Sequence, residues 1–242
     1  MNAPAGLTIP MNVAIMQPYF LPYIGYFQLI ALVDKFVIYD DIKYTKKGWI
    51  NRNRFLAGGR DAVFSLPLKK DSDALDVRNR FISPAFNRAR VMNRFREAYR
   101  HAPCFGATYP LLERIMALRE DNLFSFIHST LVMVCSHLGI KTPLVISSSL
   151  EVDRSVSGEG RVIEICKRLG ARNYINPVGG KDLYSRDYFL DQGIELRLMQ
   201  SRLIEYPQFG LPFIPWLSIV DVMMFQTVDA INRDLIPACD VY

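Results

Sequence analysis

The densest group of polar and aromatic side chains in this 242-residue sequence lies between Asp40 and Arg54. Asp40 and Asp41 are adjacent carboxylates, and Tyr44 and Trp49 stand among lysines, arginines and asparagines. Aromatic rings interleaved with cations can stack on a planar ring or a sugar face while the cations bind phosphate. The expected catalytic residues of this block are Asp40, Asp41, Lys47 and Arg52, and the expected substrate-binding residues are Tyr44, Trp49, Asn51 and Asn53.

A structural interpretation of the same block stays open. Trp49 would then fill the core from a loop whose charges are solvated, and Asp40 and Asp41 would be a helix cap and a salt-bridge partner rather than a metal site. The sequence contains only two tryptophans, so the position of Trp49 inside a basic loop favours a binding role. No cysteine or histidine spacing typical of zinc occurs, and we expect no metal site.

Further polar residues follow short apolar runs that have the pattern of buried strands. Ligands of an open parallel sheet bind outside the carboxyl ends of its strands. This rule selects Gln17 and Tyr19 after residues 13–16, Ser149 after residues 144–146, and Asn176, Gly179, Gly180 and Lys181 after residues 173–175. We predict that Gln17, Asp40, Asn51, Arg52 and Asn176 converge on one pocket.

The glycine pair Gly179-Gly180 would let a ligand approach the backbone. Its N–H groups could hold an anion beside Lys181. The segment lacks the spacing of a P-loop, and an ordinary Gly-Gly turn is an equal alternative.

Alternating strand and helix patterns are expected to position these residues. Apolar runs predict strands over 13–16, 36–39, 62–66, 144–146, 173–175 and 194–198, and helical spacing predicts helices over 21–33, 83–101, 108–139, 160–169 and 217–232. A strand, a helix and a strand within the first 40 residues form a βαβ unit, which implies a parallel sheet covered on both faces. We therefore predict an α/β fold: a single domain over 1–242 with a mostly parallel, Rossmann-like sheet of about five strands and a helical insertion over about 80–140.

Composition excludes several classes of protein. With 50% hydrophobic, 12% aromatic and 22% charged residues, the chain is not a disordered one. It contains no apolar run long enough for a transmembrane helix and no charged leader of a signal peptide. Its four cysteines are widely spaced and are expected to be reduced core thiols. These features predict a cytoplasmic protein.

A basic stretch between Arg78 and Arg100 contains seven arginines and one acid, Glu97. Such a stripe suits a phosphate-bearing partner: a nucleotide, a nucleotide-sugar, tRNA or an anionic lipid surface. A solvated helix face is the equal alternative.

Five segments of the chain resemble the WbqC-like family: residues 15–30, 34–41, 48–54, 165–171 and 174–180, in that order. The resemblance extends from about Val13 to Phe225. This family is known from gene clusters for bacterial O-antigen and related surface polysaccharides, and one member has been proposed to be a glycine transferase. The resemblance implies a role in that pathway more firmly than it implies a reaction.

A second resemblance concerns Tyr23-Ile-Gly25-Tyr26, which looks like the H-x-G-H element of nucleotidyltransferase-like (HUP-like) α/β enzymes. In those enzymes the element contacts ATP phosphates, which implies substrate-binding roles for Tyr23 and Tyr26. Tyrosine replaces both histidines here, and it has no cationic form to stabilise a phosphate.

Together these observations predict a transferase that modifies a sugar during surface-polysaccharide synthesis. Aminoacyl (glycine) transfer to an amino- or carboxy-sugar, carried by a nucleotide or a lipid, is the first candidate reaction. The acyl group would be activated by ATP or delivered by aminoacyl-tRNA, and the sequence does not choose between them. The alternative is a non-catalytic protein of the same pathway that binds a nucleotide-sugar or acts as a scaffold.

Overall fold

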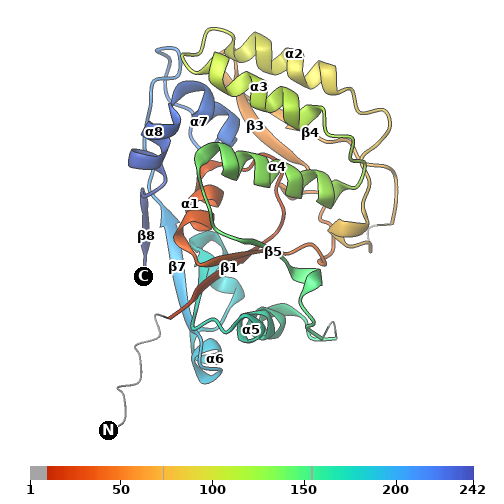
Figure 1. Cartoon of the computed structure of the whole chain (residues 1–242), viewed down its shortest axis with the longest axis vertical. Helices are drawn as coiled ribbons and strands as arrows, with labels where there is room; N and C mark the ends of the chain where they lie inside the picture. The colour runs from red at the N-terminus through yellow and green to blue at the C-terminus, as the bar shows by residue number, and fades with distance from the viewer. Residues whose placement is uncertain (1–9, 73, 154) are drawn as a thin grey trace.

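A computed structural model describes residues 10–72, 74–153 and 155–242. Within these ranges six strands form one sheet in the order β5-β2-β1-β6-β7-β8 (Figure 1). The strands are β1 (Asn12–Met16), β2 (Lys35–Ile38), β5 (Leu144–Ile146), β6 (Asn173–Pro177), β7 (Glu195–Ser201) and β8 (Cys239–Val241). The first five in this list are parallel, and β8 is antiparallel to β7. The prediction of an α/β fold with a mostly parallel sheet is confirmed.

The order of the strands reverses between β1 and β6. From β1 the chain builds outward through β2 to β5, and it then returns to the other side of β1 to add β6, β7 and β8. The register aligns Met16 with Ile38, and Ile38 with Ile146. The parallel strands therefore end at one common edge, and a crevice is expected where their order reverses.

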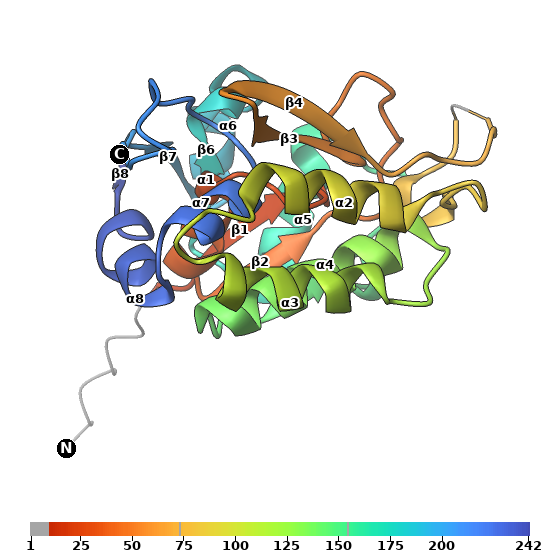
Figure 2. The same cartoon turned by 90° about the horizontal axis from the view of Figure 1, so that it is seen from above.

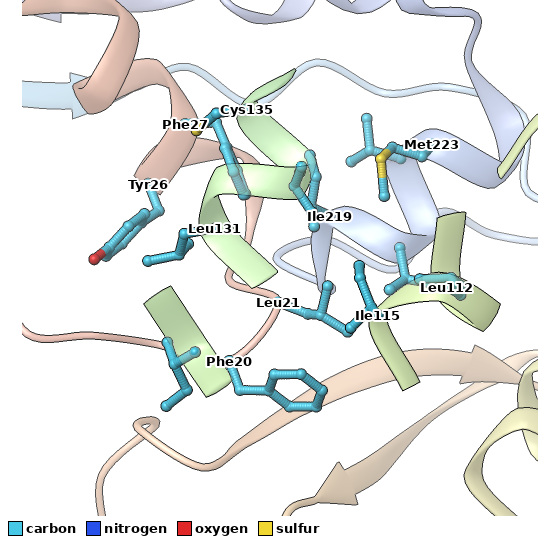
Figure 3. Packing of buried hydrophobic residues seen from close by; sticks show 14 of the residues in the cluster. Phe20, Leu21, Tyr26, Phe27, Leu112, Ile115, Leu131, Cys135, Ile219 and Met223 are labelled. Carbon is cyan, nitrogen blue, oxygen red and sulfur yellow. The ribbon is translucent and has the colours of Figure 1, made fainter. Parts of the chain in front are cut away.

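Helices cover both faces of the sheet because its central strands alternate their side chains between two cores. Val13, Ile15 and Val37 belong to the core beneath α5 (Gly158–Leu169) and α6 (Arg186–Asp191), whereas Ala14 and Phe36 belong to the opposite core. Figure 3 shows side chains from α1 (Ile24–Leu32), α3 (Phe105–Met116), α4 (Leu123–Leu138) and α7 (Ile219–Phe225) meeting in that second core.

A long connection between β2 and β5 carries a hairpin and three helices (Figure 2). The hairpin consists of β3 (Arg52–Ala57) and β4 (Arg60–Ser65), and it is followed by the 3-10 helix η1 (Val77–Asn79), α2 (Arg88–Tyr99), α3 and α4. The predicted helical insertion is thus present, but the helix predicted over 108–139 is interrupted at residues 117–122. The remaining short elements are η2 (Ser147–Ser149), η3 (Val178–Leu183), α8 (Val228–Ala230) and the π-helix η4 (Ile231–Leu235).

An irregular segment, residues 202–217, connects β7 to α7 and is called the strap below. It runs beside the hairpin, since a Cβ atom on Gly59 would lie 2.8 Å from Leu211 Cδ1 and Ser218 N donates to the Arg54 carbonyl at 2.8 Å. Prolines at 207, 212 and 215 prevent the strap from forming a regular helix or a central strand.

Two further findings concern the described residues. No helix among them is long and apolar enough to cross a membrane. All four cysteines are unpaired, and burial raises the pKa of Cys135 and Cys166 to about 12, so these two are core thiols as predicted, whereas Cys104 and Cys239 are partly exposed.

Candidate functional site

A cavity of about 460 Å³ opens at the carboxyl edge of the sheet where the strand order reverses. Its walls come from the segment after β1, the turn after β6, the end of β7, the start of β3 and the strap. The lining residues are Tyr19, Pro22, Tyr23, Trp49, Asn53, Arg54, Pro177, Val178, Gly179, Met199, Gln200, Ser201 and Trp216. This is the position at which open α/β sheets bind their ligands.

Both tryptophans of the chain line this cavity. Trp49 is 43% exposed and Trp216 is 44% exposed, although tryptophan side chains are usually well buried. The guanidinium carbon of Arg52 lies 5.2 Å from the centroid of the Trp49 ring, and the Tyr23 ring meets Trp216 edge-on at 6.0 Å. Held in this way, the two indole rings can stack on a planar ring or on the apolar face of a sugar.

The wall after β1 depends on a residue with unusual backbone geometry. Leu21 has a φ of 44°, a left-handed conformation that is rare for leucine. Its carbonyl oxygen accepts hydrogen bonds from Asn53 Nδ2 at 3.0 Å and from Ser218 Oγ at 2.7 Å. These two bonds offset the strain and fix the direction in which Pro22 and Tyr23 enter the cavity wall.

Three tyrosines after β1 have pKa values raised by burial. The neighbouring Tyr23 also raises the pKa of Tyr19, whereas Ser201 opposes the shift at Tyr23. The Tyr26 hydroxyl donates to the Gln17 carbonyl at 2.9 Å. At neutral pH these phenols are uncharged, so Tyr19 and Tyr23 offer hydroxyl groups to the cavity rather than phenolates.

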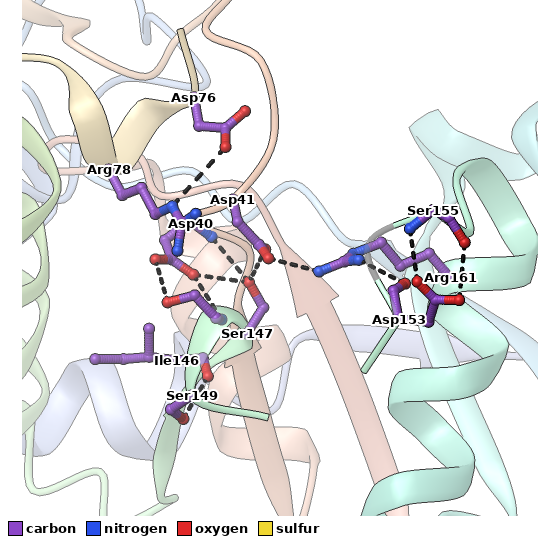
Figure 4. Close-up of polar contacts among 11 residues, drawn as sticks. Asp40, Asp41, Asp76, Arg78, Ile146, Ser147, Ser149, Asp153, Ser155 and Arg161 are labelled. Carbon is purple, nitrogen blue, oxygen red and sulfur yellow. Dashed lines mark hydrogen bonds and ion pairs between the residues drawn. The ribbon is translucent and has the colours of Figure 1, made fainter. Parts of the chain in front are cut away.

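Asp40 and Asp41 belong to a buried network outside the cavity lining (Figure 4). Asp40 accepts hydrogen bonds from Ser147 Oγ at 2.8 Å and from the Ser148 N–H at 2.9 Å. Asp41 pairs with Arg161 at 2.5 Å, and the side chains of this pair are 2% and 6% exposed. The network ties the ends of β2 and β5 to α5. The geometry therefore supports a structural role for the two carboxylates, and the catalytic role expected for them stays a prediction.

Arg52 holds the loop that carries Trp49. Its Nε donates to the Gly48 carbonyl at 2.9 Å, and its Nη2 donates to the Lys47 carbonyl at 2.7 Å. The guanidinium fork is thus used on the backbone of its own loop, and Arg52 supports the cavity through Trp49.

Several other expected binding residues lie outside the cavity lining. The Tyr44 hydroxyl donates to Asn51 Oδ1 at 2.9 Å, and both residues line a separate basic cavity with Lys46, Lys69, Lys70 and Arg80. Ser149 Oγ donates to the Ile146 carbonyl at 2.7 Å, and Lys181 is exposed.

Asn176 and Gly180 pack against each other after β6. The Asn176 side chain is buried, and its Nδ2 has no hydrogen-bond partner among the described residues. A Cβ atom at Gly180 would lie 2.4 Å from that nitrogen, so a larger residue at this position would displace the Asn176 side-chain amide.

The sequence analysis located part of the cavity. Of the expected binding residues, Tyr19, Tyr23, Trp49, Asn53 and Gly179 line it. Gln17, Asp40 and Asn176 lie at the carboxyl edge as expected, but neither they nor Asn51 and Arg52 are among the lining residues. Their convergence on one ligand stays a prediction.

The other eight lining residues were not predicted: Pro22, Arg54, Pro177, Val178, Met199, Gln200, Ser201 and Trp216. Strand β7 continues to Ser201, beyond the predicted end at Leu198. The extended β7 and the scarcity of tryptophan are the signals that point to Ser201 and Trp216.

Comparison with known proteins gives one family and one curated relative. The chain is 28% identical over 220 residues to the uncharacterized protein Rv1507c of Mycobacterium tuberculosis (strain ATCC 25618 / H37Rv), and the aligned region covers 88% of this chain and 92% of that protein. No solved structure matches the chain. The family model described as "WbqC-like protein family" matches residues 17–233, which include every residue that lines the cavity. The chain therefore belongs to the WbqC-like protein family.

Proposed function

We propose that the cavity binds a nucleotide- or lipid-linked sugar and that the protein is a transferase that modifies this sugar during synthesis of a bacterial surface polysaccharide such as O-antigen. Transfer of glycine to an amino- or carboxy-sugar is the first candidate reaction. The observation that carries the proposal is the pair of half-exposed tryptophans on a cavity at the reversal point of the sheet. Aromatic faces bind sugar rings and nucleobases, and Rossmann-like sheets bind nucleotides at this point.

The lining residues suit a reaction that is accelerated mainly by positioning the two reactants in the cavity. In glycyl transfer to an amino-sugar, the amine nitrogen of the sugar attacks the activated carboxyl carbon of glycine, a C–N bond forms, and the bond from that carbon to the leaving oxygen of AMP or of tRNA breaks. With a carboxy-sugar the amine of glycine attacks the sugar carboxyl, activated by ATP as an acyl adenylate, and AMP leaves. The amine proton passes to water. Tyr19, Tyr23 and Asn53 offer hydrogen-bond donors near the reacting groups, and Arg54 offers a positive charge. Such donors stabilise the oxyanion that develops during acyl transfer.

One observation favours the non-catalytic alternative. No aspartate, glutamate, histidine, lysine or cysteine is among the residues that line the cavity in the described part of the chain. A protein that only binds a nucleotide-sugar needs no general base, so the alternative is tested together with the transferase.

Calorimetric titration of the purified protein with nucleotide-sugars tests the binding step. We expect saturable binding by the wild type and at least roughly tenfold weaker binding by Trp216→Ala, since stacking on an aromatic side chain contributes about 1–3 kcal/mol. Tyr188→Ala is the matched control, because it removes an aromatic ring of similar exposure from α6. Equal affinities of the two variants would contradict the assigned site.

An assay for turnover distinguishes the transferase from the non-catalytic binding protein. The bound sugar is incubated with glycine and ATP, and in parallel with glycyl-tRNA, and the products are analysed by mass spectrometry. A glycyl adduct in either mixture supports the transferase and identifies its acyl donor. Binding without an adduct in both mixtures supports the binding protein.

A further inference from the structure

A second cavity, of about 480 Å³, is formed by residues before β3 and by residues on either side of η1. Among the described residues it shares no lining residue with the cavity that holds both tryptophans. The described residues that line it include four cations, Lys46, Lys69, Lys70 and Arg80, and one acid, Asp71. A concave surface with an excess of positive charge concentrates anions.

Arg80 is the most buried of these cations, with 4% of its surface exposed. Its Nη1 donates to the Ser72 carbonyl at 2.9 Å, and its guanidinium carbon lies 4.8 Å from the centroid of the Tyr44 ring. In the described part of the chain Arg80 forms no ion pair, and its Nε has no hydrogen-bond partner. Buried charges are normally paired, so Arg80 offers a charge that a bound anion can neutralise.

The neighbouring lysines Lys69 and Lys70 are exposed, and neither forms an ion pair with an acid among the described residues. The acids close to them in the chain have other partners. Asp71 accepts a hydrogen bond from the N–H of the next residue at 2.9 Å, and Asp76 pairs with Arg78 at 3.8 Å. The positive charge of these lysines is therefore available to a ligand.

Backbone contacts, rather than ion pairs, hold these cations around one cavity. The Lys69 N–H donates to the Phe81 carbonyl at 2.9 Å, and Leu68 pairs with Ile82 in an antiparallel bridge. Arg80 Nη2 donates to the Lys69 carbonyl at 3.4 Å. Like charges that face the same cavity repel one another, and a bound anion offsets this repulsion.

We propose that this cavity is a second ligand site and that it binds the diphosphate or triphosphate group of a nucleotide. Lys69, Lys70 and Arg80 together favour a ligand with more than one negative charge, which a simple carboxylate does not carry. The phosphates belong either to a free nucleotide such as ATP or to a nucleotide-sugar. The inference goes beyond the proposed function and does not depend on it, because the two cavities have separate linings in the described part of the chain.

Calorimetric titration with pyrophosphate, which carries the phosphate chemistry alone, tests the second site. We expect saturable binding by the wild type that weakens as salt is raised. The double variant Lys69→Gln with Lys70→Gln should weaken this binding by roughly tenfold or more, because it removes two charged donors from exposed positions. The double variant Arg90→Gln with Lys141→Gln is the matched control, since it removes two exposed charges from outside the cavity lining.

Lack of saturable pyrophosphate binding by the wild type, or equal affinities of the Lys69/Lys70 variant and the wild type, would overturn the inference. Parallel titrations with ATP and with a nucleotide-sugar identify the source of the phosphates, because the affinity of the true ligand falls in the Lys69/Lys70 variant. Pyrophosphate binding without any nucleotide-sugar binding refutes the proposed function alone. Nucleotide-sugar binding that depends on Trp216, together with no pyrophosphate binding, refutes the second site alone.

Discussion

Gly25, in the first turn of α1, sets the shape of the cavity wall although it does not line it. A Cβ atom at this position would lie 2.4 Å from Tyr23 Cε2 and 2.5 Å from Ser201 Oγ. We expect Gly25→Ala to displace the Tyr23 ring and to weaken ligand binding, measured by calorimetry, by roughly tenfold or more, with a lower Tm.

The control for this variant is Gly106→Ala in α3, where an added Cβ meets nothing within 4 Å. That change should leave affinity unaltered and raise the free energy of unfolding by about 0.5–1 kcal/mol, because alanine favours the helix. Wild-type affinity in Gly25→Ala would show that the position of the Tyr23 ring does not matter for binding.

Substitution of Arg52 tests whether its side chain contacts the substrate or supports only its own loop. The sequence predicts a bidentate contact with substrate, whereas the structure uses the guanidinium on the carbonyls of Lys47 and Gly48. Lysine cannot reproduce this fork. We expect Arg52→Lys to lose about 1–2 kcal/mol of stability in denaturant unfolding and to raise KM through Trp49, with kcat unchanged. A fall in kcat at unchanged KM would instead support the substrate contact.

At the scale of elements, Asp221 links α7, α2 and the strap. Its carboxylate is fully buried and accepts hydrogen bonds from Tyr99, Tyr206 and Gln208. Burial raises the pKa of Asp221 above its usual value of 3.8, and these hydrogen bonds oppose the shift. The folded protein therefore binds this proton more tightly than the unfolded chain does. The contribution of Asp221 to the free energy of unfolding is largest below pH 3.8 and falls as pH rises through its raised pKa.

Asparagine at this position carries no charge and keeps an acceptor for Tyr206 and Gln208. We expect Asp221→Asn to gain stability relative to the wild type as pH rises from about 4 to 8, as measured by Tm at each pH. Glu113→Gln, which neutralises an exposed carboxylate on α3, should show no such trend. A difference between Asp221→Asn and wild type that is constant with pH would mean that the buried carboxylate does not titrate in this range.

The sequence predicts most of the sheet because its strands are short, buried on both faces and closely followed by turn residues. It does not predict β3, since Arg52 and Arg54 alternate with a buried asparagine, and this pattern is equally typical of a basic loop. The apolar spacing over residues 108–139 continues across the break between α3 and α4. The clearer sign of this break is the N-cap of α4, because Asn122 Oδ1 accepts a hydrogen bond from the Ser125 N–H at 3.0 Å at the start of the new helix.

At the scale of the whole molecule, the basic stretch from Arg78 to Arg100 is a candidate surface for a polyanion. Three of its arginines donate to backbone carbonyls: Arg80 to Ser72 and Lys69, Arg88 to Met116 and Glu120, and Arg94 to Val63. Arg90, Arg96 and Arg100 are exposed. The stretch is therefore partly a structural feature of the insertion, and its binding of a polyanion stays a prediction.

With these three exposed arginines we expect weak binding of tRNA, with a slope of log K against log salt concentration of about −2 to −3. Filter binding between about 50 and 200 mM salt measures it. A slope of about −6, which corresponds to contacts by all seven arginines, would contradict the structural role assigned to Arg80, Arg88 and Arg94.

The residues that line the cavity are spread along the chain from Tyr19 to Trp216. Because they come from distant segments, the sequence predicts only part of the cavity. The rule that ligands bind at strand ends finds Tyr19 and Gly179, because each follows a recognisable strand, and the resemblance to the H-x-G-H element points to Tyr23. Trp216 reaches the cavity through the irregular strap, which is placed by Asp221 and by the carbonyl of Arg54 rather than by any local pattern.

The placement of both tryptophans on the cavity rim gives this protein a built-in optical probe. Indole fluorescence excited at a wavelength that tyrosine does not absorb comes from Trp49 and Trp216 alone, and both rings are half-exposed to water. A ligand stacked on either indole ring should quench the emission. Trp49→Phe and Trp216→Phe would each leave one emitter, so that the contact of a ligand with each ring could be followed separately and without a label.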